Sequence, residues 1–297
     1  MRLITRGDWD GLVCAVLLKE VEDIEEIKFA HPKDMQDGQV EVESKDIIAN
    51  LPYGEGCTMW FDHHISEESR LEKLPEVKGR YDIAPSAARL IYEYYLAEHP
   101  KLEKYGELIE ATDRIDSARL TVADVIEPKG YVLLSYTIDP RTGLGKWKDY
   151  FLNMVEWLRE KNLTQILSLD DVQDRATTVI RQQEACLQAF RQYSRREANM
   201  VITDFRDLNE VPTGNRFLVY ALYPKANVSI RIFWGRQKEK VVVAVGHSIF
   251  NRTCEVDVGK LLRDYGGGGH RGAGTCQFDT SQADDKITEL LARLRDE

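Results

Sequence analysis

Residues 57–64 read CTMWFDHH, an apolar run that ends in a carboxylate and two adjacent imidazoles. The apolar part has the length and composition of a buried strand, so Asp62, His63 and His64 are expected where that strand runs out into a loop. Two imidazoles and a carboxylate placed together there indicate a site for a metal ion and a phosphate.

A second apolar stretch, earlier in the chain, ends in the same way. Residues 3–5 (LIT) lead into RGDWDG at 6–11, and an apolar helix is expected to follow. Asp8 and Asp10 suit an ion that prefers oxygen ligands, such as Mn²⁺ or Mg²⁺. Taken alone, the pair is better explained as an acidic loop before a helix, because Asp commonly begins helices. Beside the triplet at 62–64, at another strand end, a metal site becomes the favoured interpretation.

Residues 1 to about 120 alternate between expected strands and expected helices. Strands are expected at 3–5, 26–30, 46–50 and 57–61, and helices at 11–21 and 86–95. This alternation is typical of a parallel sheet covered by helices. Ligands gather at the carboxyl ends of parallel strands, which is where Asp8, Asp10, Asn50 and the triplet fall.

The second half of the chain has a different pattern. Helices are expected from about 144 to 198, the last being a long one that begins near Ser168 or Asp170. Strands are expected in β-rich runs at 200–202, 217–220, 228–232 and 241–245. With 297 residues, 43% of them apolar, two domains are the better expectation. We predict an α/β domain with a parallel sheet at 1–170, a connecting helix at 171–198, a smaller α+β domain at 199–297, and a cleft between the domains.

Composition excludes several classes of protein. The longest strongly apolar stretch, 12–18, is far shorter than the roughly 20 residues of a membrane span, and no signal-peptide pattern follows residues 1–6. We therefore expect a cytoplasmic protein without a membrane partner. Five scattered cysteines lack C-x-x-C spacing, which argues against a disulfide framework or a zinc knuckle. The net charge of −10 argues against duplex nucleic acid but allows a small phosphorylated substrate or a short single-stranded oligonucleotide. The oligomeric state is left open, with a homodimer allowed.

Two further motifs carry polar groups. Residues 110–117 read EATDRIDS, an acidic cluster that by itself is typical of a solvated face. Residues 266–274 read GGGGHRGAG, where consecutive glycines offer backbone N–H groups that can approach an anion closely. A flexible linker is disfavoured, because apolar sequence continues on both sides. Arg252 is able to bind the same anion with two hydrogen bonds, although an ordinary exposed Arg explains it equally well.

Together, these four elements resemble the DHH phosphoesterase superfamily with its DHH-associated C-terminal domain, which carries the GGGGH motif. The resemblance spans nearly the whole chain and includes exopolyphosphatase-like and nano-RNase-like members. It implies hydrolysis of phosphoesters or phosphoanhydrides with two divalent metals in a cleft between the domains.

The resemblance also implies roles for individual residues. Asp8 would serve one metal, and Asp10, His63 and Asp113 the other. His64 would face the substrate phosphate, while Asp62 orients its neighbours. The far end of the substrate would be held by residues of the C-terminal domain, namely Arg252, Gly268, Gly269 and His270.

Two positions depart from the family pattern. Arg6 stands where many members have a histidine ligand, and a guanidinium has no lone pair to give. Asn50 stands where a carboxylate bridging both metals is expected, and its amide oxygen can ligate but brings no charge. We therefore hypothesise one divalent ion on Asp10, His63, Asp113 and Asn50, with Mn²⁺ favoured over Co²⁺ or Mg²⁺. Arg6 would replace the second ion, because its guanidinium can clamp a phosphate oxygen.

The predicted function is hydrolysis of a small phosphodiester or phosphoanhydride by metal-activated water, with His64, Arg6 and Asp62 as catalytic residues. A short oligonucleotide, a cyclic dinucleotide and polyphosphate all remain candidate substrates. The alternative is a catalytically degenerate protein that binds a nucleotide or polyphosphate without cleaving it. Aromatic side chains near the site, Trp9, Tyr53 and Trp60, either stack a base or pack in the core.

Overall fold

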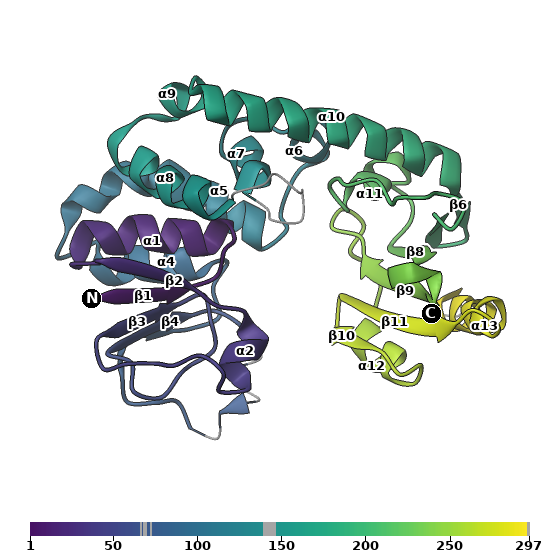
Figure 1. Ribbon diagram of the computed structural model, residues 1–297, viewed down its shortest axis with the longest axis horizontal. Coiled ribbons are helices and arrows are strands. Elements are labelled where there is room, and N and C mark those ends of the chain that lie inside the picture. Colours follow the sequence, from purple (N-terminus) through teal and green to yellow (C-terminus); the bar gives the residue numbers. More distant parts are fainter. Residues whose placement is uncertain (66, 68–69, 72, 139–146, 296–297) are drawn as a thin grey trace. The chain divides into compact units, whose positions relative to one another are not determined.

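The computed structural model describes residues 1–65, 67, 70–71, 73–138 and 147–295 (Figure 1). The chain divides into two compact units, unit 1 comprising Met1–Arg119 with Pro128–Thr177 and unit 2 comprising Leu120–Glu127 with Thr178–Glu297. Helix α10 (Asp170–Tyr193) contributes residues to both units. Within the described residues, each unit contains one sheet.

Unit 1 contains a five-stranded sheet in the order β2-β1-β3-β4-β5. All four pairings are parallel. The strands are β1 (Arg2–Thr5), β2 (Glu26–Phe29), β3 (Asp46–Ala49), β4 (Met59–Asp62) and β5 (Lys78–Tyr81). The predicted parallel sheet is confirmed. Strand β5 was not predicted, because its sequence KGRY lacks the apolar residues that identify a strand.

Helices cover both faces of this sheet (Figure 1). The helices that lie wholly in unit 1 are α1 (Trp9–Val21), α2 (Pro32–Gln36), α4 (Ala87–Tyr95), η1 (Pro100–Tyr105), α5 (Gly106–Asp116), α7 (Gly130–Ile138), α8 (Trp147–Glu160) and α9 (Leu163–Leu167). Neighbouring strand residues point to opposite faces: Leu3 packs in the cluster formed with α1, whereas Ile4 packs in a second cluster with Met35 of α2. Burial on both faces explains why the central strands read as continuous apolar runs.

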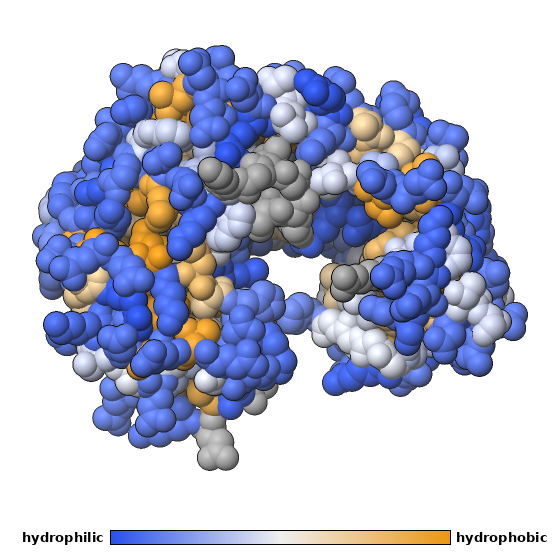
Figure 2. Space-filling view, viewed as in Figure 1, coloured by the Kyte–Doolittle hydropathy of each residue, from blue (hydrophilic) through white to orange (hydrophobic). Residues whose placement is uncertain are grey.

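The edge strand β2 is only partly buried. Phe29 lies edge-to-face with Trp147 and with Phe151 of α8, at ring-centroid distances of 5.0 and 4.8 Å. Most of the surface visible in Figure 2 is hydrophilic, and the apolar side chains of unit 1 that show there gather in a strip over α8, α1 and the sheet. The apolar layer of unit 1 therefore reaches the surface beside this edge.

Unit 2 contains a six-stranded sheet in the order β10-β11-β9-β8-β7-β6. Its strands are β6 (Ser194–Glu197), β7 (Met200–Asp204), β8 (Val228–Trp234), β9 (Lys240–His247), β10 (Gly268–His270) and β11 (Ala273–Asp279). The pairing of β7 with β8 is parallel and the others are antiparallel. The helices are α6 (Val122–Ile126), α11 (Leu218–Leu222), η3 (Arg236–Lys238), α12 (Val258–Arg263) and α13 (Ala283–Arg295). This mixed architecture is the predicted α+β arrangement.

Two predicted elements of unit 2 are wrong. The run 217–220, predicted as a strand, begins helix α11, because a four-residue apolar run carries no periodicity that separates strand from helix. Residues 194–197, predicted as helical, form β6. Of the region predicted to be helical, residues 144–146 lie outside the described residues.

The described residues contain no helix that combines the length and the hydropathy needed to cross a membrane. Cys14, Cys57, Cys186, Cys254 and Cys276 are in the thiol form, and all except Cys254 are buried. They act as packing residues, as their scattered spacing predicts.

Gly79 in β5 is expected to tolerate no side chain. Its φ is +108°, and a Cβ would lie 2.1 Å from the carbonyl oxygen of Trp60 on β4. Gly79→Ala should therefore lower the free energy of unfolding by about 3 kcal/mol, measured by urea denaturation. Gly38→Ala is the matched control: its φ is +67° but no atom lies within 4 Å of a Cβ, so only about 1 kcal/mol of backbone strain is expected. Equal losses at both positions would contradict the steric argument.

Candidate functional site

The two acidic residues after β1 have different environments. Asp8 is the N-cap of α1, and its Oδ1 accepts a hydrogen bond from Gly11 N at 3.0 Å. Asp10, in the first turn of α1, is 1% exposed. The helix-start explanation of D-x-D therefore holds for Asp8. The position of Asp10 needs a different explanation, because burying a carboxylate costs free energy unless the group has hydrogen-bonding or charged partners.

The partners of Asp10 are backbone amides at the start of α4. Its Oδ2 accepts from Ala87 N and its Oδ1 from Ala88 N, both at 2.9 Å. Ser86 is the N-cap of this helix, and its Oγ accepts from Arg89 N at 3.0 Å. The Asp10 carboxylate is thus held at a helix N-terminus, where the helix dipole favours negative charge.

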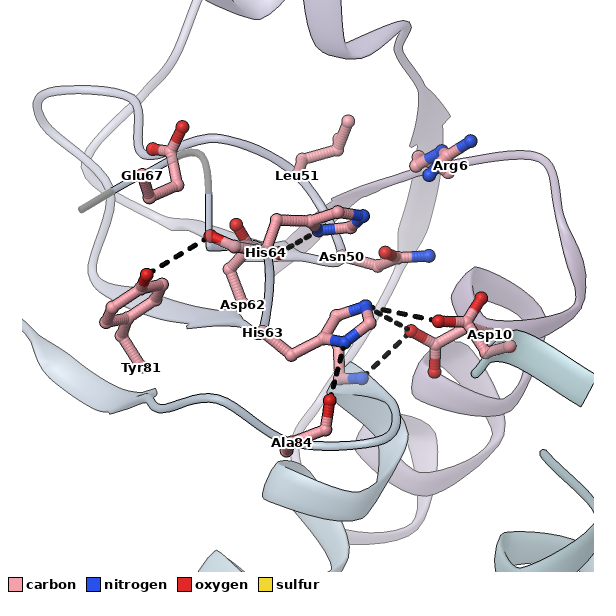
Figure 3. A network of polar contacts seen from close by, with 12 residues as sticks. Arg6, Asp10, Asn50, Leu51, Asp62, His63, His64, Glu67, Tyr81 and Ala84 are labelled. Atoms are coloured by element: carbon pink, nitrogen blue, oxygen red, sulfur yellow. Dashed lines mark hydrogen bonds and ion pairs between the residues drawn. The ribbon is translucent and has the colours of Figure 1, made fainter. Parts of the chain in front are cut away.

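His63 lies beside this carboxylate (Figure 3). Its Nδ1 lies 3.0 Å from the carbonyl oxygen of Ala84. A carbonyl only accepts, so Nδ1 carries the proton and Nε2 of the neutral ring has a free lone pair. Nε2 lies 3.6 Å from Asp10 Oδ2 and 3.3 Å from Asp116 Oδ2, and it is buried without a hydrogen-bond partner.

Asp10, His63 and Asp116 form a group that fits a metal ion. One ligand atom from each lies within 4.8 Å of the others. Burial raises the pKa of Asp10, and burial together with the charges of Asp10 and Asp8 raises the pKa of Asp116 well above its usual value. Raised carboxylate pKa values show negative charge without sufficient compensation, which a divalent cation would supply. One nitrogen and two oxygen ligands suit Mn²⁺ or Co²⁺.

The structure places Asp113 differently from the predicted ligand set. Its Oδ1 accepts from Ser86 Oγ at 2.7 Å, and its Oδ2 accepts from Nε and Nη2 of Arg89 at 2.9 and 2.6 Å. The carboxylate beside His63 belongs to Asp116, three residues later at the end of α5. Asp116 stands in the acidic stretch 110–117, but the family pattern pointed to Asp113 instead. The i, i+3 spacing was the signal that both carboxylates share one helix face.

Arg6, Asp8 and Asn50 form a second group at the same strand ends. Asp8 Oδ2 pairs with Arg6 Nε at 3.0 Å, and Asp8 Oδ1 accepts from Asn50 Nδ2 at 2.9 Å. Asn50 is buried with φ +57°, and its Oδ1 has no hydrogen-bond partner. Both oxygens of Asp8 are thus occupied by donors of the chain itself.

His64 is held by Asp62 and by its own backbone. Nδ1 of His64 lies 2.7 Å from Oδ1 of the buried Asp62, and the His64 carbonyl accepts from Tyr81 Oη at 3.1 Å. Burial lowers the pKa of His64, but the hydrogen bond and charge of Asp62 outweigh it, so the pKa is raised. The side chain is 36% exposed, so the imidazole is accessible to an anion.

Two of the nearby aromatic side chains are core residues. Trp9 is 5% exposed and its Nε1 donates to Thr112 Oγ1 at 3.0 Å. Trp60 is 2% exposed and stacks on Tyr81 at a centroid distance of 5.1 Å. These rings pack in unit 1 and are not available to stack a base.

The residues predicted to bind the far end of the substrate lie in unit 2. Gly268, Gly269 and His270 form the edge strand β10, paired with β11. Gly269 has φ +154°, and a Cβ there would lie 2.2 Å from the Ala273 carbonyl oxygen, so sheet packing by itself requires this glycine. At Gly268 a Cβ would meet no atom within 4 Å. His270 and Arg252 are exposed, and Arg252 Nε donates to the Ile249 carbonyl at 3.1 Å.

No family model and no curated protein sequence matches this chain. Among solved structures, it is similar to the pGpG-specific phosphodiesterase PggH from Vibrio cholerae, with 38% identity, a TM-score of 0.89, and coverage of 99% of this chain and 98% of that chain. RecJ from Thermus thermophilus, solved with Mn²⁺, shares the fold at 14% identity and a TM-score of 0.61, covering 100% of this chain and 52% of that chain. An exopolyphosphatase-related protein from Bacteroides fragilis shares it at 10% identity and a TM-score of 0.54, covering 99% of this chain and 92% of that chain.

A parallel sheet whose strand ends gather carboxylates and imidazoles, joined to this similarity, defines a phosphoesterase. The chain is an enzyme of the phosphoric ester hydrolase class and not merely a binding protein. It belongs to the DHH phosphoesterase superfamily, because the 38% identity extends over nearly the full length of both chains.

Asp62→Asn is expected to lower the pKa of His64. The asparagine oxygen still accepts from Nδ1 but lacks the charge that stabilises the imidazolium. Because the folded-state pKa of His64 is raised, its pairing with Asp62 contributes stability below the unfolded-state pKa, and this contribution is lost as pH rises through the folded-state value. NMR titration of His64 in metal-free protein measures the change, with His64→Gln to assign the signal. An unchanged pKa in Asp62→Asn would contradict the role given to this carboxylate.

Proposed function

We propose that this chain is a phosphodiesterase that hydrolyses a short linear dinucleotide of the pGpG kind with one divalent metal ion. The observation that carries the proposal is the free lone pair of His63 Nε2, which faces the carboxylates of Asp10 and Asp116. The substrate class is supported by similarity to a pGpG-specific phosphodiesterase over 99% of the chain. Polyphosphate is less favoured, because the exopolyphosphatase-related structure is only 10% identical and shares the fold alone.

In this proposal the ion is held by Asp10, His63 and Asp116, with Asn50 Oδ1 as a further oxygen ligand. Asp116 takes the role first given to Asp113, because Asp116 Oδ2 faces His63 Nε2 at 3.3 Å, whereas the Asp113 carboxylate is paired with the cationic Arg89. Mn²⁺ is preferred, since the donor set mixes imidazole nitrogen with oxygen. When bound, such an ion supplies a water of lowered pKa at neutral pH.

The guanidinium of Arg6 is proposed to act where other family members use a second ion. It is paired with Asp8 and its side chain remains 35% exposed, so it has donors left for a phosphate oxygen. His64, as the imidazolium that Asp62 favours, donates to the same phosphate group. Both cations stabilise the negative charge that develops on the phosphoryl oxygens during hydrolysis.

We further propose that unit 2 corresponds to the DHH-associated domain. Arg252, Gly268, Gly269 and His270 are proposed to bind the part of the substrate away from the cleaved phosphodiester. The exposure of Arg252 and His270 and the open space beside Gly268 support this assignment.

With Mn²⁺, the purified chain is expected to convert pGpG and water into two molecules of GMP, measured by chromatography of the products. His63→Ala and Asp116→Asn should each lose at least about a hundredfold in rate, because each removes an inner ligand of the ion. Asp285→Asn, an exposed acidic residue in the first turn of α13, is the matched control and should keep wild-type activity. Equal rates for wild type and His63→Ala would overturn the proposal, and faster hydrolysis of polyphosphate or a cyclic dinucleotide would overturn the substrate class.

Elemental analysis after reconstitution is expected to find one Mn²⁺ per chain. Arg6→Ala should keep that count but lower kcat on the order of a hundredfold, as expected for loss of a group that stabilises transition-state charge. Arg6→Lys keeps the positive charge but loses the planar guanidinium, so its kcat should lie between those of wild type and Arg6→Ala. Two tightly held ions at full occupancy in wild type would contradict the single-metal site.

A further inference from the structure

We infer that Asp113 is a positioning residue of the metal site, which fixes where helix α4 begins and thereby orients the Asp10 carboxylate. The inference rests on the proposed function, because it takes Asp10 as a metal ligand. It assigns Asp113 a role different from the direct ligation that the family resemblance implies.

The orientation of the Asp10 carboxylate depends on the first turn of α4. A helix leaves its first N–H groups without intrahelical partners. At α4, those of Ala87 and Ala88 donate to the two Asp10 oxygens, and that of Arg89 donates to Ser86 Oγ. Because both Asp10 oxygens are bound in this way, a shift or rotation of the first turn of α4 turns the carboxylate with it.

Asp113 in turn holds this first turn of α4. Ser86 Oγ accepts from Arg89 N, so its single hydroxyl proton is free to be donated, and Asp113 Oδ1 receives it at 2.7 Å. Asp113 Oδ2 accepts hydrogen bonds from Nε and Nη2 of Arg89. One buried carboxylate therefore holds both the N-cap residue and the third residue of the helix, and Ser86 is fully buried.

Asp113 and its neighbour Thr112 are also connected to the rest of the site. Asp113 and Asp116 lie three residues apart on α5, so anchoring the first also places the second. The neighbouring Thr112 accepts from Trp9 Nε1, and Trp9 immediately precedes Asp10 on α1. Asp10, the α4 amides and Asp116 are thus held in one mutual arrangement by contacts that pass through residues 112 and 113.

Asp113 is poorly suited to bind an ion itself. Its two oxygens accept one hydroxyl and two guanidinium hydrogen bonds, and the charge of Arg89 compensates its own. Asp116 Oδ2, in contrast, faces His63 Nε2 at 3.3 Å. The two carboxylates of α5 therefore have separate tasks.

The experiment measures the Mn²⁺ dissociation constant by isothermal titration calorimetry, and kcat for pGpG at saturating Mn²⁺. Asp113→Asn is expected to raise the dissociation constant tenfold to about a hundredfold, the range usual for partners that orient metal ligands, and to lower kcat at saturating Mn²⁺ by a smaller factor. Ser86→Ala should raise the Mn²⁺ dissociation constant by a similar factor. Ser86→Thr, which keeps the hydroxyl, should bind Mn²⁺ with wild-type affinity. The double variant should be no weaker than the weaker single variant, because both act through one chain of contacts. Asp149→Asn, exposed on α8, is the control and should bind as wild type.

Two results would overturn the inference. Asp113→Asn with wild-type affinity would show that the contact does not orient Asp10. Loss of all binding in Asp113→Asn, with wild-type affinity in Ser86→Ala, would show that Asp113 is itself a ligand. Circular dichroism of the metal-free variants confirms folding, and the pair Ser86→Ala and Ser86→Thr decides the question if Asp113→Asn does not fold. Failure of the proposed function is recognised separately, since Asp10→Asn and His63→Ala would then bind Mn²⁺ as wild type does.

Discussion

The bidentate contact between the Asp10 carboxylate and the first amides of α4 is the interaction on which the site depends. A fully buried charge requires compensation, and here it comes from two N–H groups and a helix dipole rather than from a cationic side chain. Amides satisfy the carboxylate but do not neutralise it, and burial still raises its pKa. The remaining lone pairs face His63 and Asp116, so the fold itself creates a place that favours a cation.

The strand order explains why these groups meet. Strand β1 is paired with β3 and β3 with β4, and their last paired residues are Thr5, Ala49 and Phe61. The residues that follow these positions are Arg6, Asn50 and Asp62, so three segments far apart in sequence end side by side at one edge of the sheet. Parallel pairing is essential, because in an antiparallel sheet neighbouring strands would end at opposite edges.

Sequence reasoning predicted what depends on local pattern. The apolar runs gave the parallel strands and the position of Asp10, Asn50 and His63 at their ends. The sequence alone could not decide whether Asp113 or Asp116 lies beside His63. That choice depends on the contacts of Asp113 with Ser86 and Arg89, which lie at the start of another helix. Helix α11 was missed for a related reason: its short apolar run is compatible with either structure, and the Asn215 side chain that accepts from Phe217 N at its start is visible only in three dimensions.

The two departures from the family pattern are complementary on the proposed single-metal interpretation. In the two-metal pattern, a neutral histidine, a bridging carboxylate and a divalent ion together carry a formal charge of about +1. Arg6 with Asn50 carries the same formal charge without the ion. Geometry agrees with this count, since the Arg6 guanidinium and the Asn50 amide donate to the two oxygens of Asp8 that would otherwise serve as metal ligands. On this proposal, either change alone would leave a surplus or a deficit of charge beside the substrate phosphate.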